Sequence, residues 1–314
     1  MPSVSTILIP LFGCIAVGVA SGAWRLFGWS EARVLSRFVF LVAMPITVLS
    51  FTRKAEVPNL AYAGLVGGYL LATMLSAGAA FLLSRKLLGL TVQEAGAAVF
   101  ATTCGNAVFL GLPIALAVGS WAPPFLMLMI CEGLFVFALG TSLMTWPAPG
   151  AAPPRGGVLG TSLGAAWRAG RNPIVLAFLI GLSLDVLGFE WPEPVGRFLD
   201  LFGGVAGPAG LFVLGLMLAL LPGRQSELNP RALAALLPVK LAVYPGLCGG
   251  FVWLFTRDPV LTQTALLFTA LPPAVASIVQ SAHYRRYEAG TAALVGSGTL
   301  IGLATVTLLL LVLL

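Results

Sequence analysis

Long apolar runs, separated by short clusters of charged residues, prolines and glycines, make up most of the chain. A helix of about 20 apolar residues crosses the hydrocarbon core of a bilayer. Dividing the chain at the charges and the Pro/Gly clusters predicts ten such helices, which cover residues 4–23, 35–52, 60–84, 94–119, 123–145, 172–188, 200–221, 231–255, 260–283 and 289–313. The runs do not alternate as the strands of a membrane barrel do. The pattern therefore predicts an all-α polytopic membrane protein.

The composition supports this interpretation and excludes several other classes. Of the 314 residues, 59% are hydrophobic and 9% are charged, whereas soluble proteins carry about 25% charged residues. The basic residues form no stripe with interleaved aromatics, which argues against nucleic acid as a partner. The four cysteines, Cys14, Cys104, Cys131 and Cys248, have no ligand spacing and are interpreted as small buried hydrophobes. No metal or cofactor motif and no catalytic motif is found, so we expect no enzyme.

The charges between the predicted helices indicate the orientation. One set of alternate connections holds twelve basic residues: Arg25, Arg33, Arg37, Arg85, Lys86, Arg155, Arg168, Arg171, Arg224, Arg231, Arg285 and Arg286. The other set holds four: Arg53, Lys54, Arg197 and Arg257. Because cytoplasmic loops carry the excess of Lys and Arg, both termini are predicted to be extracytoplasmic. A multi-pass protein of the bacterial inner (plasma) membrane is the expected setting.

The longest connection divides the predicted helices into two sets of five. Its Pro/Gly-rich residues, 147–171, are expected to form a cytoplasmic linker, with a short interfacial helix around 158–168. The halves, 1–146 and 172–314, share weak similarities, including WSEARVLSRF at Trp29 and WPEPVGRF at Trp191. Three matched pairs have similar offsets: 162 for Trp29/Trp191, 163 for Pro45/Pro208 and 159 for Pro113/Pro272. Five spans per half is an odd number, which predicts two inverted repeats, an architecture of transporters.

Two predicted spans carry helix-breaking residues in their middle. They are TTCGNAVFLGLP, from Thr102, and TALPPAVASIVQ, from Thr269. A proline removes one N–H group and clashes with the carbonyl four residues earlier. A broken helix exposes an N-terminus with free N–H donors, which suits an anion. The predicted substrate-binding residues are Thr102, Thr103, Gly105, Asn106, Pro113, Pro272, Pro273, Ser277 and Gln280.

The simpler interpretation is that each proline kinks a helix only for packing. Two such breaks, at matching positions of two halves, favour a binding site. Small residues four apart, at Gly18/Gly22, Gly64/Gly68 and Gly246/Gly250, are explained by close helix packing, and membrane-facing glycines would also permit a homodimer.

Glu132 and Lys240 are the two ionisable residues well inside predicted spans. Such residues usually face a cavity or a partner. At about 1.5 Å per residue, both lie roughly 13 Å deep in a core about 30 Å thick. A structural Glu132–Lys240 pair is one hypothesis. The alternative makes Lys240 the counter-ion of a substrate carboxylate and Glu132 a proton carrier. Asp185 and Asp200, near outer span ends, are expected to be solvated.

The chain resembles the auxin efflux carrier family over essentially its whole length. The similar motifs are Arg37-Phe38 with Met44-Pro45, Asn106-x-x-Phe109-x-Gly111-x-Pro113, Arg171-Asn172-Pro173, Pro208-Ala209-x-Leu211-Phe212-x-x-Gly215, Lys240 with Pro245, and Pro272-Pro273-Ala274. One departure is visible, because this chain has Ala276-Ser277 where the family often shows Asn after the second proline.

The resemblance implies a ten-helix fold with crossed, broken helices 4 and 9. It also implies transport of organic anions: malonate or malate in bacterial members and auxin in plants. Spans 1, 2, 6 and 7 would form a scaffold, and the other spans a unit that moves across it.

The predicted function is alternating-access transport of a small organic anion, a dicarboxylate or an auxin-like carboxylate. The alternative transporter is a cation/proton antiporter, which needs carboxylates beside the crossing. The sequence has none in 95–131 or 259–287. A membrane enzyme or a sensor is a different class, but neither a polar constellation at a membrane face nor a soluble output domain is evident.

Overall fold

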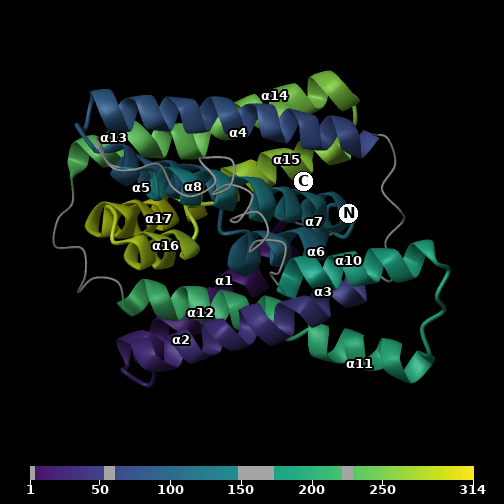
Figure 1. Ribbon diagram of the computed structural model, residues 1–314. Helices are drawn as coiled ribbons and strands as arrows, with labels where there is room; N and C mark the ends of the chain where they lie inside the picture. Colours follow the sequence, from purple (N-terminus) through teal and green to yellow (C-terminus); the bar gives the residue numbers. More distant parts are fainter. Residues whose placement is uncertain (1–3, 53–60, 148–172, 221–228) are drawn as a thin grey trace.

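The computed structural model describes residues 4–52, 61–147, 173–220 and 229–314, and these ranges are helical (Figure 1). Elements before the central connection are α1 (Val4–Ala23), α2 (Trp29–Phe38), η1 (Val39–Ala43), α3 (Met44–Thr52), α4 (Ala61–Lys86), α5 (Val92–Thr103), η2 (Ala107–Gly111), α6 (Leu112–Val118), α7 (Ala122–Cys131), η3 (Glu132–Val136) and α8 (Phe137–Met144). Those after it are α10 (Pro173–Val186), α11 (Glu193–Gly203), α12 (Ala206–Leu220), α13 (Pro230–Pro238), η5 (Val239–Val243), α14 (Tyr244–Thr256), α15 (Pro259–Ala270), α16 (Ala276–Tyr284) and α17 (Glu288–Leu313).

Six helical stretches in the described ranges are long and apolar enough to cross a membrane: Trp29–Ser50, Tyr62–Lys86, Ala122–Met144, Glu193–Leu220, Pro230–Thr256 and Glu288–Leu313. Each corresponds to one of the ten predicted spans. The protein is thus a multi-pass membrane protein, and the described part of its chain is all-helical. The predicted helix around 158–168, and the linker beyond residue 147, lie outside the described residues.

Two predicted spans, 94–119 and 260–283, are each divided in two. α5 ends at Thr103, and the helical course resumes with η2 at Ala107. α15 ends at Ala270, and α16 begins at Ala276. The second division falls at Pro272-Pro273, as predicted. In the first span the division falls at Gly105-Asn106, inside the predicted stretch from Thr102 to Pro113. Pro113 itself lies in the first turn of α6, where a missing N–H costs little.

A π-helical turn precedes three of the intramembrane prolines. η1 ends two residues before Pro45, η2 two before Pro113, and η5 two before Pro245. A proline cannot donate to the carbonyl four residues earlier and crowds it. Widening one turn relieves that crowding without ending the helix, and such π-turns are frequent at functional sites.

The helices pack in two bundles (Figure 1). The lower bundle comprises α1, α2, α3, α10, α11 and α12, in which α12 packs along α1, and α3 packs against α10 and α11. The upper bundle comprises α4 to α8 and α13 to α17, in which α14 packs against α4 and α15, and α5 packs against α8. The bundles meet mainly where η2 and α6 contact α12 and α1.

Glycines set the closest helix contacts inside each bundle. A Cβ atom on Gly18 of α1 would lie 2.1 Å from the carbonyl oxygen of Phe212 in α12. One on Gly181 of α10 would lie 1.8 Å from Thr52 Oγ1 in α3. In the upper bundle, a Cβ on Gly68 of α4 would lie 2.9 Å from the backbone nitrogen of Val252. At Gly18 and Gly68 the helices therefore approach backbone to backbone, whereas Gly181 packs against the Thr52 side chain.

Candidate functional site

The two helix breaks meet, and short backbone hydrogen bonds join them. Asn106 N donates to the carbonyl oxygen of Pro272 at 2.9 Å, and Ala274 N donates to that of Cys104 at 3.1 Å. Between these bonds, Gly105 and Pro273 form an isolated antiparallel bridge. We call this contact the crossing. Through it, the two interrupted helices satisfy each other's backbone hydrogen-bonding groups in a region without water.

The carboxylate of Glu132 supplies another acceptor at the crossing. Its Oε1 accepts a hydrogen bond of 2.7 Å from Gly105 N, and its side chain is buried. The N–H groups of Gly105, Asn106 and Ala274 thus all have acceptors within the protein. The expectation that the breaks present bare N–H groups to a ligand is wrong for these three positions, because an unpaired buried N–H is costly.

The prolines of the second break free two carbonyl groups. In a continuous helix, the N–H groups of residues 272 and 273 would bond the carbonyls of Phe268 and Thr269, and proline has no N–H to give. Lys240 Nζ donates to the carbonyl oxygen of Thr269 at 3.3 Å. Lys240 is 1% exposed and lies in the π-turn η5, with its Nζ 5.1 Å from the centre of the Tyr244 ring.

Glu132 and Lys240 both lie beside Gly105. A Cβ atom on Gly105 would be 3.3 Å from the Phe268 carbonyl oxygen and 3.5 Å from Lys240 Nζ, while Gly105 N bonds Glu132. The two charges interact electrostatically. The similar depth of Glu132 and Lys240 could be predicted from their positions in the spans. Their location at the crossing was not predicted. The helix breaks and the buried charges therefore form one site.

Two polar side chains of the breaks are buried without a hydrogen-bond partner in the described part of the chain: Asn106, at its Nδ2, and Ser277, at its Oγ. By contrast, the hydroxyls of Thr102 and Thr103 donate to carbonyls of their own helix, Ala98 and Val99, each at 2.8 Å. Gln280 is half-buried on α16. Among the predicted residues, Asn106 and Ser277 are the strongest candidates to bind a ligand.

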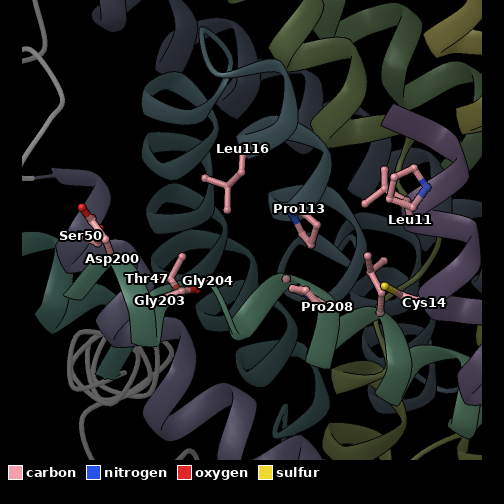
Figure 2. A pocket seen from close by; sticks show the side chains of 13 residues that line it. Leu11, Cys14, Thr47, Ser50, Pro113, Leu116, Asp200, Gly203, Gly204 and Pro208 are labelled. Atoms are coloured by element: carbon pink, nitrogen blue, oxygen red, sulfur yellow. The ribbon is translucent and has the colours of Figure 1, made fainter. Parts of the chain in front are cut away.

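A cavity of about 410 Å³ lies between the two bundles, beside α6 (Figure 2). Pro113 and Leu116 of α6 line it from the upper bundle, and Pro208 of α12 and Cys14 of α1 line it from the lower bundle. Pro113, predicted as a substrate-binding residue, thus lines this cavity and lies outside the backbone bridge of the crossing.

Sequence reasoning missed three polar residues that line this cavity. Thr47 Oγ1 donates to the carbonyl oxygen of Gly203 at 2.7 Å, and Ser50 Oγ donates to Asp200 Oδ1 at 2.5 Å. Asp200 is exposed, in line with the expectation that it is solvated. A hydroxyl inside an apolar span is common, and no local signal pairs Ser50 with a residue 150 positions away.

The described residues contain no group of three His, Cys, Asp or Glu side chains that could hold a metal ion. A multi-pass helical protein with two interrupted helices meeting around buried polar groups has the build of a membrane transport protein. A family model described as membrane transport protein matches residues 3–145 and 160–310. The chain belongs to this family, the auxin efflux carrier family, and the predicted resemblance is confirmed.

The chain is also similar to a protein of Rhizobium meliloti (strain 1021) named "Putative malonate transporter". The two are 28% identical over 323 aligned positions, which cover 99% of this chain and 96% of the relative. The similarity therefore extends over both helix breaks.

Proposed function

We propose that the protein is a secondary transporter of a small organic anion, with a dicarboxylate such as malonate or malate as its substrate. The observation that carries the proposal is the crossing, where the two helix breaks meet and where Asn106 Nδ2 and Ser277 Oγ are buried without a partner in the described part of the chain. The name of the Rhizobium meliloti relative supports the choice of dicarboxylate. An auxin-like carboxylate is the other candidate substrate.

The substrate is bound mainly by side-chain donors. An amide and a hydroxyl donate to a carboxylate oxygen, and hydrogen bonds to a charged group are the stronger kind. The proposed site keeps all the predicted residues around these two: Thr102, Thr103, Gly105, Pro113, Pro272, Pro273 and Gln280. The cavity beside Pro113 provides the approach to the site between the bundles.

The fold is proposed to consist of ten spans in two inverted repeats, 1–146 and 172–314, joined by the linker 147–171. Helix pairs that the repeat would relate to each other pack alike. α1 against α12 and α10 against α3 are both close pairs with a glycine in the contact, at Gly18 and at Gly181. The two breaks fall in the proposed spans 4 and 9, which the repeat would relate to each other.

Transport is proposed to follow an elevator-type movement, in which the upper bundle carries the crossing past the lower bundle. The surface of α12 that faces η2 and α6 is smooth, with Gly207 against Pro113 and Gly210 against Phe109. Small residues leave no ridge to hinder sliding. The excess of basic residues on one side favours extracytoplasmic termini in a bacterial inner membrane.

A cation/proton antiporter is the second candidate, and one observation favours it. Residues 95–131 and 259–287, which contain the breaks, hold no carboxylate, yet Glu132 reaches Gly105 at the crossing. A proton gradient across proteoliposomes distinguishes the two. An antiporter would move sodium or potassium ions against protons without any organic acid present.

Counterflow in proteoliposomes tests the proposed function. Vesicles loaded with unlabelled malonate or malate are diluted into a trace of the labelled acid, with an indole acid as a parallel substrate. Saturable accumulation of label, absent from protein-free vesicles, is expected for a dicarboxylate. If none of these acids exchanges, the protein is not the proposed carrier.

A further inference from the structure

Oxygen atoms with a negative partial or full charge surround Gly105. The carbonyls of Phe268 and Thr269 lost their helical donors to Pro272 and Pro273, and they lie in the last turn of α15. The carboxylate of Glu132 bonds Gly105 N. The Phe268 oxygen is 3.3 Å from the point where a Gly105 Cβ would lie.

Such a set of oxygen atoms is suited to a small cation. The C-terminal end of a helix carries about half a negative charge. In transporters with discontinuous helices, unwound carbonyls and the C-terminal ends of half-helices coordinate sodium ions. A carboxylate beside them would balance the charge of a monovalent cation.

In this protein, a positively charged side chain already lies at that position. Lys240 Nζ donates to the Thr269 carbonyl, lies 3.5 Å from the same Gly105 Cβ point, and interacts electrostatically with Glu132. Its side chain is 1% exposed. A buried charge is tolerated only with partners that compensate for its lost hydration, and the Thr269 carbonyl and the Glu132 carboxylate are such partners.

We propose that the Lys240 ammonium group is a built-in cation at the crossing. It takes the place of a sodium ion, so the protein binds no sodium there and works without a sodium gradient. Because the ammonium is part of η5 in the upper bundle, its charge stays with the crossing in every state. Removing the side chain turns the crossing into a sodium site formed by the Thr269 and Phe268 carbonyls and Glu132.

The first test measures stability and does not depend on transport. The melting temperatures of purified wild-type protein, Lys240→Ala and Lys240→Met are compared in sodium chloride and in choline chloride at equal ionic strength. A ligand that binds only the folded protein stabilises it, so sodium is expected to raise the melting temperature of Lys240→Ala by about 3 °C or more. The wild type and Lys240→Met, whose side chain fills the space without a charge, are expected to show no sodium effect.

The second test measures uptake and rests on the proposed transport function. Wild-type uptake of labelled malonate should be equal, within about twofold, in sodium and in choline. Lys240→Ala should lose about nine-tenths of the rate in choline and regain at least about fivefold in sodium. If malonate is not transported at all, the proposed function fails, while the stability test still decides the role of Lys240.

Two results would overturn the inference. One is sodium-dependent stability of the wild type, which would show that the cation position is open. The other is a folded Lys240→Ala protein that sodium does not stabilise, which would fit Lys240 as the counter-ion of the substrate. Should Lys240→Ala fail to fold, Lys240→Ser, whose hydroxyl is a further cation ligand, replaces it, and the wild-type comparison stands by itself.

Discussion

At the scale of single residues, Glu132 substitutes for a missing helical acceptor. In a continuous helix, Gly105 N would bond the carbonyl four residues earlier, but the break turns it toward the Glu132 carboxylate at 2.7 Å. A side chain of another helix thus supports the broken end of α5. The crossing depends on this support because its backbone is buried.

Replacing Glu132 tests this support. Glu132→Ala leaves Gly105 N–H unpaired at a cost of about 1–3 kcal/mol, which lowers the melting temperature by about 2–4 °C for each kcal/mol. Glu132→Gln keeps an acceptor oxygen and is expected to be more stable than the alanine variant. Both remove the charge, so the charge does not contribute to their difference, which reports the hydrogen bond together with the packing of the side chain. Equal melting temperatures for the two variants would contradict its assigned role.

Residue chemistry explains which parts of this site could be predicted. The freed carbonyls of Phe268 and Thr269 follow from Pro272 and Pro273 alone, because the effect of proline is local. The contact of Glu132 with Gly105 joins positions 27 residues apart on different helices. The apolar sequence around Glu132 predicts that this rare intramembrane charge is buried. Only tertiary packing determines that its partner is Gly105.

At the scale of elements, backbone contact at glycines joins α1 to α12 in the lower bundle. Gly18 of α1 would bring a Cβ within 2.1 Å of the Phe212 carbonyl oxygen, whereas a Cβ on Gly13 of the same helix meets nothing within 4 Å. These two glycines therefore differ in packing and share a helix, which makes them a matched pair.

Gly18→Ala should destabilise the protein, and Gly13→Ala should not. Overpacking of a tight contact costs about 1–3 kcal/mol, so the melting temperature of Gly18→Ala is expected to fall by several degrees. The Gly13→Ala variant carries the same change in helix propensity without the clash. Thermal unfolding in detergent measures both, and equal values would contradict a rigid α1–α12 contact.

Spacing rules predicted some of these contacts and failed for others. Gly18/Gly22 and Gly64/Gly68 do pack closely, against α12 and α14. For Gly246 and Gly250 the prediction is wrong, because a Cβ at either position meets nothing within 4 Å. The spacing identifies a smooth helix face but cannot tell whether another helix covers it.

At the scale of the whole molecule, the proposed movement passes through the contact of α6 with α12. The Cβ of Pro113 lies 3.8 Å from the point where a Gly207 Cβ would be. That distance equals the usual Cβ separation in disulfides, about 3.8 Å. A covalent link at this point would tie the upper bundle to the lower one.

A Pro113→Cys/Gly207→Cys pair, in a background without the four native cysteines, should form a disulfide that stops transport. Reduction should restore the rate toward that of the unlinked pair. The control is Gly64→Cys/Phe255→Cys, which links α4 to α14 inside the upper bundle, where the corresponding Cβ distance is 3.3 Å. Unchanged uptake with the first pair fully oxidised would contradict relative movement of the bundles.

The membrane class, the positions of most helices and the two interrupted spans could all be predicted, because they depend on hydrophobicity and proline. The division into bundles was implied only by family resemblance. The cavity could not be predicted, since it forms where helices far apart in sequence meet, as Ser50 and Asp200 do.

The most direct test of the central claim, an organic anion held by side chains at the crossing, is malonate counterflow with an Asn106→Ala/Ser277→Ala variant. Gln93→Ala serves as the control. Gln93 lies at the start of α5, away from the crossing, and its amide donates to the carbonyl oxygen of Trp146. Losing two hydrogen bonds to a charged group, each worth about 1.5–3 kcal/mol, should raise the KM for malonate at least about tenfold. Gln93→Ala should keep the wild-type KM. A double variant that folds and transports malonate with the wild-type KM would contradict the account.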